Sequence, residues 1–157
     1  MSGLVITEGD PREPDIQVLL SNHLSFAAEH SPPEDVHALD TEGLLSPAVT
    51  FFSARRDGVL LGVGAIKEIE PSHGEIKSMH TSQSARGQGI GRAMLEHLLA
   101  VARERGYGRV SLETGTMEAF APARALYLDS GFVECAPFSG YWDSPYSVCM
   151  TLELRPA

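Results

Sequence analysis

Arg86-Gly87-Gln88-Gly89-Ile90-Gly91-Arg92 is the stretch from which the fold and function of this chain are inferred. It follows an extended run at 75–81 and precedes a segment whose apolar residues recur at helical spacing. This order predicts a strand, a glycine-rich turn and a helix N-terminus. The first N–H groups of a helix lack internal partners and carry partial positive charge, so the stretch predicts a phosphate or pyrophosphate site. Its glycines permit positive φ and let several amides converge on one anion.

Two common phosphate-binding motifs do not fit this stretch. A P-loop requires G-x-x-x-x-G-K-[ST], and the only Lys-Ser pair, at Lys77, precedes the glycines. A dinucleotide fingerprint requires G-x-G-x-x-G, and counting from Gly87 places Arg92 at the third glycine position. The turn instead fits [RQ]-x-x-G-x-[GA].

With that motif the sequence resembles the GNAT superfamily of N-acetyltransferases, whose members hold the pyrophosphate of acetyl-CoA on this turn. The resemblance extends over residues 4–154 and is strongest over 74–132. It includes G-E-I-K-S-M at 74–79, L-E-T-G at 112–115 and P-A-R-x-L-Y-x-x-x-G-F at 122–132, as in a small bacterial branch of the superfamily. By this resemblance the cofactor-binding residues of the turn are Arg86, Gly87, Gln88, Gly89, Ile90, Gly91 and Arg92.

Hydrophobic periodicity and turn signals predict the same order of elements as the superfamily. The expected strands cover 4–7, 49–54, 59–66, 75–81, 109–114, 132–135 and 147–154, and the expected helices cover 14–28, a short segment at 35–39, 90–105 and 122–129. We therefore expect a single α/β domain over residues 1–157, of GNAT fold, with a mixed seven-stranded sheet flanked by helices. The resemblance implies that its fourth and fifth strands splay apart to admit the pantetheine arm of the cofactor.

Composition and charge narrow the possible partners. The chain has 157 residues and a net charge of -9, which argues against a nucleic-acid partner. No apolar run approaches the length of a membrane span and no secretory signal is visible, so we expect a cytoplasmic protein with no membrane partner. The two cysteines, Cys135 and Cys149, form no C-x-x-C, and the six histidines show no ligand spacing, so no metal is expected.

The resemblance also suggests which residues carry the chemistry. GNAT enzymes transfer acetyl directly, and backbone groups near Met79, His80 and Thr81 would pair with pantetheine and polarise the thioester oxygen. Tyr127 occupies the general-acid position of the pattern N-x-x-A-x-x-x-Y-x-x-x-G-F. The chain departs from that pattern at Phe120, where an asparagine commonly contacts the cofactor.

Several groups are candidates for the general base. Glu75 lies eleven residues before Arg86, the spacing of the glutamate in histone-type members. Glu113, His80 and a chain of water molecules are the alternatives.

The acceptor site is expected in the loops at 35–45 and 137–146, the second of which is rich in aromatic residues. The candidate acceptor-binding residues are His37, Glu113, Phe138 and Tyr141. We expect an acetyl-CoA-dependent N-acetyltransferase that acts on a primary amine of a small molecule or a peptide. The alternatives are a non-catalytic CoA-binding sensor and an acyltransferase with another acyl donor or an O-acceptor. By analogy with the superfamily, the chain is also a possible homodimer.

Overall fold

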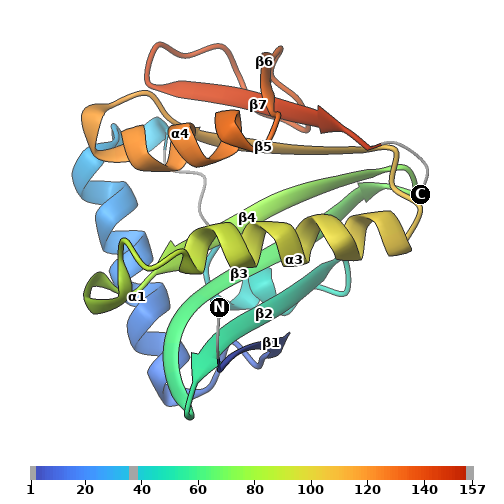
Figure 1. The fold of residues 1–157 in the computed structure, drawn as a ribbon. Coiled ribbons are helices and arrows are strands. Elements are labelled where there is room, and N and C mark those ends of the chain that lie inside the picture. Colours follow the sequence, from blue (N-terminus) through green and yellow to red (C-terminus); the bar gives the residue numbers. More distant parts are fainter. Residues whose placement is uncertain (1–2, 36–38, 155–157) are drawn as a thin grey trace.

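A computed structural model describes residues 3–35 and 39–154 of the chain (Figure 1). They form one seven-stranded sheet in the order β1-β2-β3-β4-β5-β7-β6. The strands are β1 (Leu4–Glu8), β2 (Val49–Arg56), β3 (Val59–Glu70), β4 (His73–Thr81), β5 (Arg109–Gly115), β6 (Val133–Cys135) and β7 (Ser147–Glu153). The helices are α1 (Pro14–His30), α2 (Thr41–Leu44), α3 (Ile90–Glu104) and α4 (Ala121–Asp129), with 3-10 turns at Pro33–Asp35, Gln83–Ala85 and Glu118–Phe120.

The first four strands form the antiparallel meander expected from the sequence. Asp57 and Gly58 connect β2 to β3 with φ angles of 52° and 79°, the left-handed pair that a two-residue hairpin turn requires. The next turn is shorter than predicted, because His73 already pairs with Glu70. Gly74 lies within β4, where an added Cβ would come within 2.8 Å of the Tyr107 ring. This glycine therefore marks a close packing contact instead of a turn.

The splay between β4 and β5 is confirmed. The two strands pair in parallel at only three positions, His73 with Arg109, Gly74 with Val110 and Glu75 with Ser111. Beyond these positions the two strands diverge, as Figure 1 shows for the β4 and β5 ribbons, which separate as they run away from the end of the chain marked C. The sheet therefore consists of two hydrogen-bonded halves joined by one short seam.

A chain of polar groups, in which His73 and Ser111 are buried, reinforces this seam. The Arg109 guanidinium donates to His73 Nδ1 at 3.3 Å, and His73 Nε2 lies 2.6 Å from Ser111 Oγ. Ser111 Oγ in turn lies 2.9 Å from Thr151 Oγ1 on β7. Since arginine only donates, His73 accepts at Nδ1 and donates from Nε2. Burial and the adjacent guanidinium lower the pKa of His73, which favours this neutral form.

A bulge in β4 reverses the alternation of its side chains. Ala65 pairs with Lys77 and Val63 pairs with His80, so Gly64 alone faces Ser78 and Met79. Ser78 adopts a φ of 55°, in the left-handed region that residues other than glycine seldom adopt. Because of the extra residue, Lys77 and His80 lie on the same face of the sheet.

Each face of the sheet is covered by helices. The residues Ile16, Leu19, Leu20, Leu44, Phe51, Val63 and Ala65 form the core between the sheet and α1 and α2. The opposite core lies under α3 and α4 and includes Met94, Leu95, Leu98, Val110, Leu112, Tyr127 and Phe132. Helix α3 packs closely on β3 because Gly64 has no side chain, and an added Cβ there would lie 2.7 Å from Met94 Cγ. No helix of the described residues is long and apolar enough to cross a membrane.

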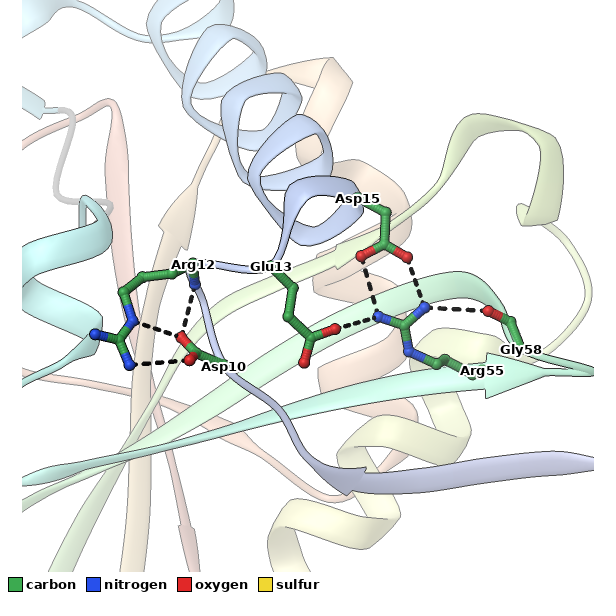
Figure 2. Close-up of polar contacts among 6 residues, drawn as sticks. All are labelled: Asp10, Arg12, Glu13, Asp15, Arg55 and Gly58. Carbon is green, nitrogen blue, oxygen red and sulfur yellow. Dashed lines mark hydrogen bonds and ion pairs between the residues drawn. The ribbon is translucent and has the colours of Figure 1, made fainter.

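The start of α1 is fixed to β2 by ion pairs (Figure 2). The Arg55 guanidinium contacts Glu13 at 3.0 Å and Asp15 at 2.6 Å, and it also donates to the carbonyl of Gly58. Its hydrogen bond and positive charge lower the pKa of Asp15. These contacts orient the helix whose far end reaches the opening between β4 and β5.

The structure adds one helix that the sequence did not predict. Asp40 caps α2 by accepting a hydrogen bond from the N–H of Gly43 at 2.9 Å. The predicted short helix at 35–39 falls mostly on residues 36–38, which lie outside the described part of the chain; a 3-10 turn at Pro33–Asp35 precedes them.

Candidate functional site

A cavity of about 640 Å³ opens where β4 and β5 separate. Its walls come from α1, the bulged part of β4, the glycine turn, the start of α3, β5, α4 and one residue of the β6–β7 loop. It thus extends from the glycine turn through the gap in the sheet to the face covered by α1.

The glycine turn forms one end of the cavity, and two of its glycines adopt left-handed backbone angles before the start of α3. Gly87 and Gly89 have φ angles of 79° and 81°, and Gly89 is the N-cap of α3. Arg86, Gly87, Gly89, Ile90 and Gly91 line the cavity, whereas Gln88 and Arg92 do not. Gln88 Nε2 instead donates a hydrogen bond to the carbonyl of Ser84, and the Arg92 guanidinium lies 3.5 Å from Asp129 Oδ2.

The predicted pantetheine segment also lines the cavity. Met79, His80 and Thr81 lie on the part of β4 that has lost its β5 partner. Ser78, which the sequence analysis missed, lies beside them, and its buried Oγ has no hydrogen-bond partner among the described residues. An extended backbone edge and an unsatisfied hydroxyl fit a ligand that carries amide groups, as the pantetheine arm of CoA does.

Tyr127 lies on α4 in the cavity wall with its side chain only 6% exposed. Burial and the charge of Glu113 raise the pKa of Tyr127 to about 12. Phe120 contacts Phe26 of α1 edge to face at 5.3 Å between ring centroids, and it fills the space beside Gly115. This position supplies an apolar wall where the family pattern has an asparagine.

The face of the sheet under α1 carries the ionisable groups. Glu75 is a buried residue of β4. Its carboxylate accepts hydrogen bonds from the Tyr141 hydroxyl and from Lys77 Nζ at 3.2 Å. Lys77 Nζ also donates to Tyr141 Oη at 2.7 Å. Lys77 and Tyr141 line the cavity, whereas Glu75 lies behind them.

The other candidate bases differ in their surroundings. Glu113 lines the cavity from β5, and its carboxylate accepts a hydrogen bond from Ser147 Oγ at 2.6 Å. His80 contacts His23 of α1 at 3.2 Å between their Nδ1 atoms. Burial lowers the pKa of each imidazole to about 4, so both are neutral at pH 7 and His80 is a weak proton acceptor.

Of the two other predicted acceptor residues, the structure describes only Phe138. Phe138 packs against Tyr141 at 5.1 Å and against His73 at 5.8 Å between ring centroids, outside the cavity lining. His37 lies outside the described residues. Within residues 3–35 and 39–154, no cluster of three or more His, Cys, Asp or Glu side chains is placed to hold a metal ion.

Lys77 and His23 are site residues that the sequence analysis missed. Alternation along an extended strand places Lys77 on the face of Glu75, which was a usable signal. His23 had none, because only the tertiary fold brings α1 over β4.

Comparisons with known proteins identify relatives of this chain. The chain matches the Acetyltransferase (GNAT) family over residues 16–132. It is 48% identical to the uncharacterized N-acetyltransferase YsnE of Bacillus subtilis, over 87% of this chain and 90% of that protein. It is 41% identical to the uncharacterized N-acetyltransferase YedL of Escherichia coli, over 95% of this chain and 94% of that protein.

Solved structures share the fold. A candidate acyl-CoA N-acyltransferase from Klebsiella pneumoniae matches with a TM-score of 0.79 and 28% identity, over 97% of this chain and 98% of the other. A GNAT family acetyltransferase from Elizabethkingia anophelis, with acetyl-CoA bound, matches with a TM-score of 0.72 over 98% of this chain and 100% of the other. At 18% identity the second likeness shows the fold alone.

Proposed function

We propose that this chain, which belongs to the GNAT family of acetyltransferases, transfers acetyl directly from acetyl-CoA to a primary amine of a small molecule or a peptide. Residues 1–157 would form a single N-acetyltransferase domain. The observation that carries the proposal is the cavity between β4 and β5, which joins an anion-binding turn to a polar face under α1. A donor and an acceptor can therefore meet within one cleft, and positioning two reactants in this way lowers the barrier to their reaction.

The turn at the start of α3 would hold the pyrophosphate of the donor. Two glycines in the left-handed region aim their backbone N–H groups differently from a regular helix, and Arg86 adds positive charge at the rim. The unpaired edge of β4 at 76–81 would hydrogen-bond the pantetheine arm, as an added strand does. The thioester carbonyl oxygen of acetyl-CoA needs a hydrogen bond from the protein. The bulge at Ser78 and Met79 points backbone N–H groups away from the regular ladder, where they would be available for this bond.

Tyr127 would act as the general acid that protonates the thiolate leaving group. Its raised pKa keeps the hydroxyl protonated at neutral pH, so a proton is present for the leaving sulfur. The location of Tyr127 in the wall of the cavity supports this role.

Glu75 would act as the general base through Tyr141. The buried carboxylate accepts a hydrogen bond from the Tyr141 hydroxyl, and Tyr141 lines the cavity. Burial and the Glu75 charge raise the pKa of Tyr141, so the hydroxyl can pass a proton to Glu75 without ionising itself. The ammonium group of the acceptor would lose one proton to Tyr141 as Tyr141 gives its own proton to Glu75. Glu113 would bind the acceptor ammonium from the opposite strand.

Calorimetric titration with acetyl-CoA, followed by assay of free CoA thiol with a panel of amines, tests the proposal. We expect binding and turnover, and we expect Gly89→Glu to abolish both because a carboxylate would occupy the anion site. Gly58→Glu is the matched control, since Gly58 has the same left-handed φ in a hairpin outside the cavity lining. Binding without turnover on any amine would favour a CoA sensor, and absence of binding would refute the role of the turn.

A further inference from the structure

We propose that the acceptor is a free α-amino acid, with its carboxylate bound by Lys77 and its amine held by Glu113. This inference rests on the proposed acetyltransfer and identifies the class of acceptor. It begins with the register of the two splayed strands. Glu75 is paired with Ser111 at the last position of the seam, so Lys77 and Glu113, two residues further on, face each other across the gap on the same side of the sheet.

Lys77 has the contacts of a binding group that is already oriented. Its side chain is 10% exposed and lines the cavity, while Glu75, at 3%, lies behind it. An ammonium group has three N–H donors. Among the described residues, Glu75 and the Tyr141 hydroxyl accept two of them, at 3.2 Å and 2.7 Å, so one donor remains for a ligand. The two acceptors also fix the side chain in one position, which reduces the entropy lost on binding.

A buried ammonium is unfavourable in a site that binds only a simple amine. The acceptor arrives mostly as a cation, and the Lys77 ammonium, although paired with Glu75, opposes its close approach. A ligand that also carries a carboxylate removes this conflict, because an ammonium–carboxylate hydrogen bond is charge-assisted. Glu113, on the facing strand, supplies the complementary negative charge. The two edges of the gap therefore present opposite charges, and an α-amino acid carries its own opposite charges on adjacent groups.

The neighbouring wall indicates the kind of side chain that fits. His80 is the next residue of β4 on this face after Lys77, and its ring lies 6.2 Å from Phe26 and 5.0 Å from His23. All three line the cavity. Rings without charge favour an apolar or aromatic acceptor side chain, which would gain from its burial there.

The test compares acceptors that differ only at the carboxylate. Turnover of acetyl-CoA is measured with phenylalanine, phenylalaninamide and phenethylamine, and with leucine, leucinamide and isopentylamine. We expect kcat/KM for each free amino acid to exceed that for its amide and its amine by about 10- to 100-fold. Lys77→Met should remove this preference, chiefly by raising KM for the amino acid. Lys67→Met, a substitution of the only other lysine, should retain it.

The outcomes separate this inference from the proposed function. Equal kcat/KM for acids and amides, or a preference for dipeptides, would overturn the amino-acid assignment and leave acetyltransfer intact. If none of the six compounds is acetylated, the amino-acid assignment is wrong. If the wild-type protein does not bind acetyl-CoA, the proposed function itself is wrong. The comparison among acceptors uses the wild-type protein, so it decides the question even if Lys77→Met fails to fold.

Discussion

Acidification from pH 7.5 to pH 5 should destabilise the protein through the half-buried pair His23 and His80. Burial lowers the pKa of each imidazole from 6.5 to about 4. Between these values the unfolded chain binds more protons than the folded protein, so stability falls as the pH falls below 6.5. At pH 5 each histidine contributes a loss of about 2 kcal/mol, since one pKa unit corresponds to about 1.4 kcal/mol. With a reduction for partial exposure and for their mutual interaction, we expect about 2–4 kcal/mol for the pair.

Urea unfolding followed by circular dichroism at pH 7.5, 6 and 5 measures this loss. The comparison is with the double variant His23→Leu/His80→Leu, which lacks both titrating groups but retains every carboxylate and the other histidines. The wild type should lose about 2–4 kcal/mol more than the variant between pH 7.5 and pH 5. Equal losses in the two proteins would refute the argument, because they would show that these imidazoles protonate as easily in the folded state as in the unfolded state.

Three further predictions concern the reaction and the packing. Tyr127→Phe should lower kcat about 100-fold without changing acetyl-CoA affinity, as single-turnover kinetics and calorimetry would show; an unchanged kcat would remove its role as the acid. Tyr141→Phe should lower kcat by a similar factor, because it removes the hydroxyl that passes the proton to Glu75, whereas Glu113→Gln should mainly raise KM for the amine. The reverse pattern in steady-state kinetics would make Glu113 the base. Gly64→Val should lower the free energy of unfolding, measured with urea, by about 1–3 kcal/mol because the valine side chain would overlap Met94. A loss no larger than that of Gly108→Val, a position with open space, would contradict the packing argument.

The sequence predicted those parts of the site that depend on short local patterns. The glycine turn and Tyr127 lie within single motifs, and the structure places both in the cavity wall. The contacts of Glu75 could not be predicted, because Tyr141, which covers it, is 66 residues away in the chain.

The bulge at Ser78 explains another difference between sequence and structure. Strict alternation from Glu75 would place Met79 on the face of Lys77 and His80 on the opposite face. One extra residue reverses the order, so that His80 pairs with Val63 on the α1 side while Met79 packs in the core beneath α3. The sequence of β4 carries no glycine at the bulge to mark it.

The short seam between β4 and β5 has a mechanical consequence for the enzyme. A small rotation of one half of the sheet relative to the other about the seam displaces residues near the seam little and distant residues more. Lys77 and Glu113 lie two residues beyond the last pair of the seam, whereas His80 and Thr81 lie farther along the opening. The proposed acceptor-binding groups therefore occupy the part of the cleft whose width varies least, and the wide end can open for a long donor without disturbing their alignment.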